Sequence, residues 1–346
     1  MRKITGRITF FIILVVLLVI ASQIFDRMSA AEGRRGEHSL DYIYTLFGEE
    51  KRDSLDVIVI GDSESVAGYS PLEAYLDSGV ASFSASRAAM RMQEAYPLLR
   101  MAVLRQHPKA VLVEALAMTV PMEKDEARRI MAESTAKNLF PVFRFHNAWR
   151  HLINPLDWQP KMWKGYIIRK GVERPSQAER DDYMKPDSGK SDISPENVSA
   201  LRRMKVFCDA HGTKLILFAC PSTTNYDMTV HNAIEEIAED SGIPFLDLNL
   251  SADEIGIDWN TDTFDKGDHL NLSGAQKMTK YLTRQVRDMV PSLPDRRADP
   301  DYADWNEEAE AYRKDADEGM EIIRETVKKQ EARRERRKKK QRKNTT

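Results

Sequence analysis

Cysteine is nearly absent from this chain of 346 residues, which contains only Cys208 and Cys220. Two cysteines do not form a disulfide framework, and the sequence does not decide whether they pair. No spacing of histidine and cysteine is typical of a zinc site, so the sequence implies no metal centre. Apolar residues make up 42% of the chain, enough for a packed core, and the length allows one large domain or two small ones.

Long hydrophobic runs are also scarce, and the clear one lies close to the N-terminus. Ile8 to Phe25 are 18 residues without a charge. A helix of that length spans about 27 Å, close to the core of a bilayer. The preceding segment, MRKITGR, is basic and favours a cytoplasmic N-terminus. We expect residues 1–25 to form a basic start and a single-pass membrane anchor, with the main domain extracytoplasmic. A cleaved signal peptide is the alternative, with MSAAEG at residues 28–33 as its cleavage segment.

The small net charge of −2 conceals an asymmetry between the C-terminal tail and the rest of the chain. Lys328 to Lys343 contain eleven Lys and Arg against two Glu, so the remainder is clearly acidic. We expect residues 291–346 to form a charged tail, helical or disordered. Such a tail is solvated or binds an anionic wall polymer or lipid headgroups. Nucleic acid is not an expected partner outside the cell.

Five short apolar runs after residue 53 predict buried strands. They are Leu55–Ile60, Gly79–Ser84, Ala110–Leu116, Thr213–Ala219 and Ile243–Leu248. Helix-like stretches alternate with them, which predicts a three-layer α/β/α sandwich with a mainly parallel five-stranded sheet over residues 54–290. Residues 26–53 read as a polar connector, and residues 121–193 as an insertion of short helices. In such sheets ligands bind at the carboxyl ends of the strands.

Two segments read as helix starts with capping boxes. Ser70 is followed by Pro71 and, three residues on, by Glu73, and the segment Ser273–Gln276 has the same pattern. We expect helices to begin at both places. The second would run to about Met289.

A candidate nucleophile stands where the first strand ends, in VIVIGDSESVAGYSP. Ser63 is either an ordinary turn serine or a nucleophile, which needs a base, usually His, that a carboxylate holds in place. Of seven histidines, only His269 lies in a suitable loop, TDTFDKGDHLNLSG, before a helix. Asp262, Asp265 and Asp268 surround it. This combination favours Ser63 as nucleophile and His269 as base.

These two blocks, Gly61-Asp62-Ser63 and Asp265 to Asn271 (DKGDHLN), resemble the SGNH/GDSL hydrolase superfamily. More narrowly, Leu55 to Met289 looks like membrane-anchored SGNH-like proteins of bacterial surfaces, which act beside polysaccharide or teichoic-acid acylation systems. The resemblance implies a flavodoxin-like SGNH fold and no cofactor. It also implies that Ser63 attacks an acyl carbonyl and that His269 is the base. Asp265 would orient His269, with Asp262 as the alternative acid.

The chain departs from the family pattern at several positions. The family spaces the acid three residues before the histidine, whereas Asp265 is four before His269, and Gly267 is expected to let the loop turn. Asp268 is expected to point away from His269. Where the family has an oxyanion-hole glycine, this chain offers Ser84 or Ser86, and no Asn follows the third strand. Weaker candidates for substrate contacts are Asn225, His231 and Glu114.

The sequence thus predicts an extracytoplasmic esterase or O-acyltransferase that acts on a cell-surface glycopolymer. A polytopic membrane acyltransferase is an expected partner, and that expectation comes from the resemblance. The alternative is a catalytically idle binding or scaffold protein, favoured by the missing Asn and glycine. A phosphate-binding α/β protein is disfavoured because no P-loop lysine follows the turn. The acyl group, the polymer and the oligomeric state stay open.

Overall fold

A computed structural model describes residues 2–32, 40–145 and 161–344. Its centre is a parallel five-stranded sheet in the order β2-β1-β3-β4-β5. The strands are β1 (Val57–Ile60), β2 (Ser82–Ser84), β3 (Ala110–Glu114), β4 (Lys214–Ala219) and β5 (Phe245–Asp247). All five predicted strands are confirmed. The strand order reverses at β1, so the end of β1 is a topological switch point, where α/β sheets bind ligands.

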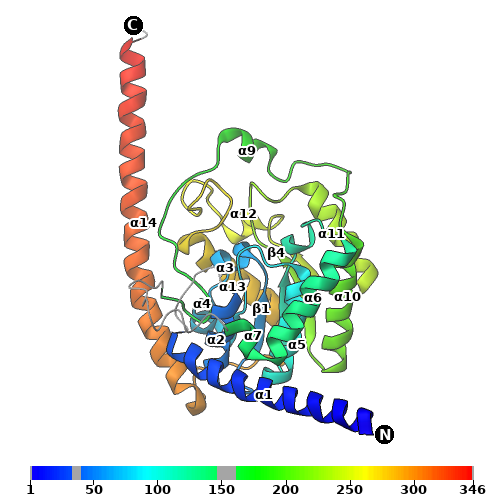
Figure 1. The fold of residues 1–346 in the computed structure, drawn as a ribbon. Helices are drawn as coiled ribbons and strands as arrows, with labels where there is room; N and C mark the ends of the chain where they lie inside the picture. The colour runs from blue at the N-terminus through cyan, green and yellow to red at the C-terminus, as the bar shows by residue number, and fades with distance from the viewer. Residues whose placement is uncertain (1, 33–39, 146–160, 345–346) are drawn as a thin grey trace.

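Alternate residues of each strand point to opposite faces of the sheet, and each face has its own core. Ile58 and Ile60 of β1 belong to the core that contains α5 (Met92–Gln106) and α10 (Pro195–Ala210). Val57 and Val59 belong to the second core, which contains α13 (Leu272–Met289). Figure 1 shows these helices around the sheet. The predicted three-layer α/β/α sandwich is therefore confirmed.

Side-chain caps define where the helices around the sheet begin. Ser70 Oγ accepts the N–H of Glu73 at the start of α4 (Pro71–Ser78), as its sequence predicts. Helix α13 was expected to begin with Ser273 as its cap, and this expectation is wrong. Asn271 is the cap, because its Oδ1 accepts the N–H groups of Ser273 and Gly274. The remaining helices on the sheet are α3 (Ser63–Gly68), α11 (Met228–Ser241) and α12 (Ala252–Ile255).

The two segments expected to be a connector and an insertion contain packed structure. In the first, α2 (Leu40–Glu49) buries Ile43 and Phe47 in the core, so residues 40–49 belong to the packed domain. In the second, α6 (Lys124–Leu139) packs along α5 and is longer than the short helices expected, while α7 (Pro141–Phe145) and α9 (Gln177–Asp182) are short. Residues 33–39 and 146–160 of these segments lie outside the described residues.

Two long helices extend from the domain. Helix α1 (Arg2–Glu32) contains Gly6–Ile24, the one span in the described residues that is long and apolar enough to cross a membrane. Its apolar side chains are exposed, and it contacts α7. Helix α14 (Ala303–Asn344) packs on the domain through Trp305, Tyr312 and Ile323, and its basic C-terminal half projects beyond the domain (Figure 1).

Candidate functional site

Ser63 is the first residue of α3, at the carboxyl end of β1. The preceding Asp62 caps this helix, and its Oδ1 accepts the N–H of Glu64 at 3.0 Å. Gly61 is required for close approach, because a Cβ there would lie 2.4 Å from the Cβ of Glu114 on β3. The turn therefore holds Ser63, which is half-buried, at the edge of the sheet where ligands bind.

His269 and Asp265 form a close pair in the loop before α13. Asp265 Oδ2 lies 2.6 Å from His269 Nδ1, and Asp265 Oδ1 accepts the backbone N–H of His269 at 2.7 Å. The loop reaches this geometry through left-handed backbone at Lys266 (φ 67°) and Gly267 (φ 90°). The four-residue spacing therefore still lets Asp265 orient the imidazole, as expected from Gly267.

The second ring nitrogen, His269 Nε2, is buried and has no hydrogen-bond partner among the described residues. Ser63 Oγ is therefore not bonded to it in this structure. Burial lowers the pKa of His269, but the hydrogen bond with Asp265 and the nearby charges of Glu64 and Asp268 outweigh it and raise the pKa to about 9. His269 is thus a strong base placed among carboxylates.

Three buried carboxyl groups lie around the end of β1. Asp62, Glu64 and Glu114 are all less than 8% exposed, and burial raises the pKa of each. The carboxyl groups of Asp62 and Glu114 interact with each other at this end of the sheet. Glu114 therefore lies in the site region beside Asp62, as the sequence suggested.

Asn225 connects Glu64 to the histidine loop. Its Nδ2 donates to Glu64 Oε1 at 3.0 Å and to Asp268 Oδ1. Asp268 Oδ2 lies 3.5 Å from His269 Nδ1, so the expectation that Asp268 points away is wrong. The carboxylate turns inward because Asn225 holds it. Asn225 is thus at the site, as its position after β4 indicated.

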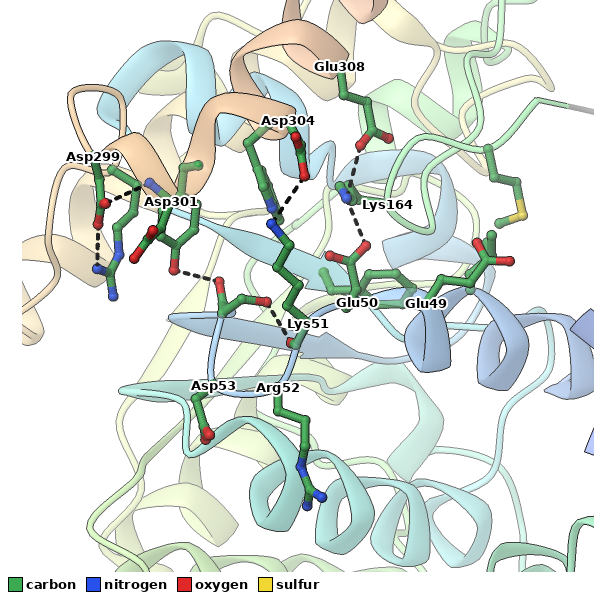
Figure 2. A pocket seen from close by; sticks show the side chains of 17 residues that line it. Glu49, Glu50, Lys51, Arg52, Asp53, Lys164, Asp299, Asp301, Asp304 and Glu308 are labelled. Carbon is green, nitrogen blue, oxygen red and sulfur yellow. Dashed lines mark hydrogen bonds and ion pairs between the residues drawn. The ribbon is translucent and has the colours of Figure 1, made fainter. Parts of the chain in front are cut away.

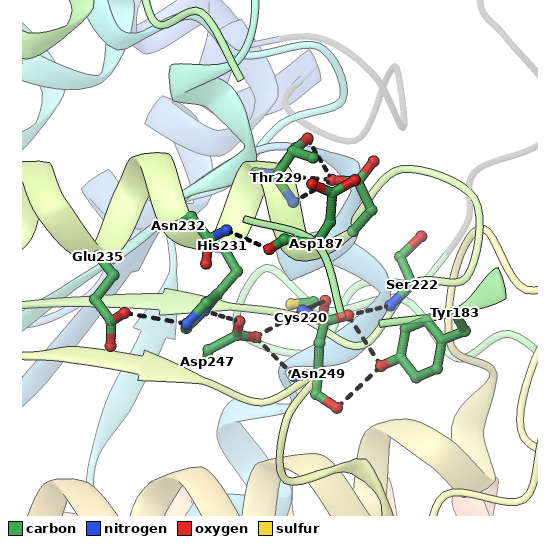
Figure 3. Close-up of polar contacts among 12 residues, drawn as sticks. Tyr183, Asp187, Cys220, Ser222, Thr229, His231, Asn232, Glu235, Asp247 and Asn249 are labelled. Atoms are coloured by element: carbon green, nitrogen blue, oxygen red, sulfur yellow. Dashed lines mark hydrogen bonds and ion pairs between the residues drawn. The ribbon is translucent and has the colours of Figure 1, made fainter. Parts of the chain in front are cut away.

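A polar network fixes the loop that carries Asn225 (Figure 3). Asn249, just after β5, accepts the N–H of Ser222 at 3.0 Å and donates to the carbonyl of Cys220 at 3.0 Å. The hydroxyl of Tyr183 donates to Asn249. This arrangement holds the β4 exit loop against the loop of His269, because Thr223 N–H donates to the carbonyl of Gly267 at 2.9 Å.

His231 lies in that network and not at the substrate edge that its sequence position suggested. It is 6% exposed, with Nδ1 2.6 Å from Asp247 Oδ2 and Nε2 3.3 Å from Glu235 Oε2 (Figure 3). Asp247 ends β5, so the pair joins α11 to the sheet. We therefore assign His231 a structural role.

The stability that the His231–Asp247 pair provides is expected to depend on pH. The hydrogen bond with Asp247 raises the pKa of His231 above its ordinary value. Its contribution is therefore fully present below about pH 6.5, the unfolded value, and is lost as the pH rises through the folded value. We expect His231→Gln to lower the melting temperature more at pH 6 than at pH 9. The exposed His211→Gln is the control, and an equal loss at both pH values would contradict the prediction.

Two other candidates are engaged elsewhere. Asp262, the alternative acid, is completely buried, and its Oδ2 binds Lys277 Nζ at 2.6 Å and the N–H of Asp258 at 2.8 Å. It holds the loop and does not contact His269. The N–H of Ser84 already donates to the carbonyl of Lys164 at 2.9 Å, which removes Ser84 as an oxyanion donor.

Ser86 remains as the second backbone donor. It is buried two residues beyond β2, and no acceptor in the described part of the chain receives its N–H. The N–H of Ser63 is likewise free. A carbonyl oxygen bound at the end of β1 would thus find donors that are not already used.

A polar cavity of about 480 Å³ lies at the opposite edge of the sheet, next to Ser54 before β1 (Figure 2). Its charged residues are largely paired. Lys164 Nζ lies between Glu50 at 2.8 Å and Glu308 at 2.9 Å. Through Lys164 these pairs link Glu50, which directly follows α2, to Glu308 near the start of α14, so we assign this cavity a role in docking α14.

No family model matches the chain, and no curated protein matches its sequence. Among solved structures it is similar to a lipase/acylhydrolase from Enterococcus faecalis, with 13% identity, a TM-score of 0.36 and coverage of 68% of this chain and 97% of that one. It is also similar to a gut microbial diltiazem-metabolizing enzyme, with 12% identity, a TM-score of 0.29 and coverage of 69% of this chain and 48% of that one.

Glu64 is the site residue that the sequence analysis did not select. In the sequence it is an acidic residue in the first turn of a helix, a common and unremarked position. Its burial and its bond to Asn225, which lies 161 residues away, emerge only from the fold. Its place directly after Ser63 was the one available signal.

Proposed function

We propose that this chain hydrolyses or transfers an O-acyl group through Ser63, with His269 as the base and Asp265 as the residue that orients it. One observation carries the proposal. Asp265 binds His269 Nδ1 at 2.6 Å. The other ring nitrogen, Nε2, is buried and has no partner among the described residues, so it is the nitrogen that can accept a proton. Ser63 begins α3 at the same edge of the sheet.

The proposed reaction follows from these groups. His269, in the neutral form that its pKa of about 9 favours at alkaline pH, takes the proton of Ser63 Oγ while Oγ bonds to the acyl carbonyl carbon. The N–H groups of Ser63 and Ser86 stabilise the oxyanion. The alcohol then leaves with the proton from His269, and the acyl group stays on Ser63. Water, or the hydroxyl of an acceptor, releases the acyl group with the help of His269. The bond between Ser63 and His269 would form when substrate binds, since such bonds are often long in unliganded sites.

We further propose that the substrate is an acylated cell-surface glycopolymer and that a polytopic membrane acyltransferase supplies acyl groups. The support is the apolar span Gly6–Ile24 in α1, which is suited to anchor the domain beside a membrane, together with the sequence resemblance. The chain would then be a single-pass protein with the domain outside.

A second candidate function is a catalytically idle scaffold that binds a polymer or an acyltransferase. The observations that favour it are that Glu114 ends β3 where an oxyanion-hole Asn is absent, and that Nε2 is not bonded to Ser63. Incubation of the purified chain with a fluorophosphonate tests both candidates. A covalent adduct on the Ser63 peptide, found by mass spectrometry, supports the acyl-enzyme. If Ser63 stays unmodified while a trypsin control reacts, the scaffold is favoured.

The anchor gives a separate prediction. We expect the full chain to stay in the membrane pellet after an alkaline carbonate wash, because most side chains of Gly6–Ile24 are apolar and exposed. A chain that starts at Asp26 is expected in the supernatant. A reporter fused after Thr346 is expected to be active only outside the cytoplasm, and cytoplasmic signal would contradict the orientation.

A further inference from the structure

Three side chains with metal-ligand chemistry converge beside Ser63. One potential ligand atom each from Glu64, Asp268 and His269 lies within 4.8 Å of the other two. Bonds of about 2.1 Å from a metal at tetrahedral angles place ligand atoms about 3.4 Å apart. The three side chains would therefore need to close by about an ångström around an ion. The sequence spacing does not reveal this group, because two members are adjacent and the third follows a different strand.

Each of the three side chains is held by an outer contact of the kind found around metal sites. Asp265 binds His269 Nδ1 at 2.6 Å, which leaves Nε2 as the nitrogen for an ion. Asn225 Nδ2 donates to Glu64 Oε1 at 3.0 Å and also to Asp268 Oδ1. Asn225 thus holds one oxygen of each carboxylate. The other oxygen of Glu64 is buried without a partner among the described residues, and that of Asp268 lies 3.5 Å from His269 Nδ1. Such outer contacts fix ligand orientation and strengthen binding.

Two atoms of the group are buried without a partner among the described residues. They are Glu64 Oε2 and His269 Nε2. Glu64 as a whole is only 2% exposed. A buried polar atom without a hydrogen-bond partner destabilises the folded state. A cation bound between the carboxylates and the imidazole would give both atoms a partner. The side chain of Asp268 is 33% exposed, which gives an ion access from solvent.

We propose that Glu64, Asp268 and His269 bind one divalent cation of the zinc class, and that the bound cation inhibits acyl transfer at Ser63. Nitrogen and carboxylate oxygen are ligands that suit such an ion, and three protein ligands leave one position for water. Inhibition follows because coordination occupies the lone pair of His269 Nε2 that must accept the proton of Ser63. This second statement rests on the proposed function, whereas binding itself does not.

Binding is tested by calorimetry with Zn²⁺ on the full chain in detergent, after removal of metals with a chelator. We expect one site per chain that Glu64→Gln and Asp268→Asn each weaken at least tenfold. Asn225→Ala is expected to weaken it about 10- to 100-fold, as for other outer-contact residues. Glu235→Gln, which alters the separate pair with His231, is the matched control and should bind like the wild type. Circular dichroism shows whether each variant is folded. Equal Zn²⁺ affinity in all folded variants would overturn the proposal.

Inhibition is tested on the hydrolysis of a small acetyl ester. We expect Zn²⁺ to abolish turnover over the concentration range in which it binds, and excess chelator to restore it. Turnover that persists with the site saturated would overturn the inhibitory role. Ser63→Ala separates this inference from the proposed function, since it should retain the zinc site. A chain without esterase activity that still binds Zn²⁺ through Glu64 would contradict the proposed function and support the site.

Discussion

Ser63→Ala is expected to lower kcat for a small acetyl ester by about four to six orders of magnitude, as loss of a catalytic serine does elsewhere. The reason is that, in the proposed reaction, Ser63 Oγ is the atom that bonds to the acyl carbon. KM should change little. The measurement is the steady-state rate with chelator present, together with mass spectrometry for an acyl group on the Ser63 peptide.

The control for this substitution is Ser251→Ala. Ser251 directly precedes helix α12, and its side chain makes no capping hydrogen bond, so its loss should change neither rate nor stability. If Ser63→Ala retains the wild-type rate, Ser63 is not the nucleophile and the acyl-enzyme proposal fails. If the wild type is inactive and forms no adduct, the scaffold candidate gains support.

The strands were predictable because a parallel sheet covered on both faces requires apolar side chains on both faces of every strand. Those runs are visible without any tertiary information. The cap of α13 was less predictable, because Asn271 and Ser273 are both good caps and only the backbone path decides between them. In the structure the Asn271 side chain bonds the Ser273 and Gly274 N–H groups, so Ser273 lies inside the helix.

The candidate site was predictable only where its residues carry a local pattern. Ser63 and His269 stand in distinctive loops, and Gly267 signals the turn that brings Asp265 to the imidazole. The roles of Asn225 and His231 depended on partners that are distant in the sequence. His231 follows β4 in the sequence, but its Nδ1 lies 2.6 Å from Oδ2 of Asp247 in β5. No local sequence pattern reveals that pairing.

Asp265→Asn and Asp262→Asn are expected to have opposite effects, and the comparison tests which carboxylate orients His269. Asp265→Asn should lower kcat about 10⁴-fold, because an amide favours the wrong tautomer of His269 and no longer stabilises the imidazolium. Its effect on unfolding should be small, since the Asp265 side chain is 32% exposed. Asp262→Asn should keep kcat within a few-fold of the wild type, because Asp262 does not contact His269.

Asp262→Asn should instead lower the free energy of unfolding by about 1–3 kcal/mol, the usual loss for a buried charge-assisted hydrogen bond. The fully buried carboxylate binds Lys277 and the N–H of Asp258, and these bonds hold the segment before the His269 loop. Urea unfolding of both variants, measured beside their kinetics, checks the prediction. A 10⁴-fold loss of kcat in Asp262→Asn with unchanged stability would mean that the loop rearranges on substrate binding and that Asp262 is the orienting acid. A large loss of kcat in Asp265→Asn, together with a loss of stability but not of kcat in Asp262→Asn, would assign that role to Asp265. The imidazole loses its orientation when the carboxylate that holds it is replaced.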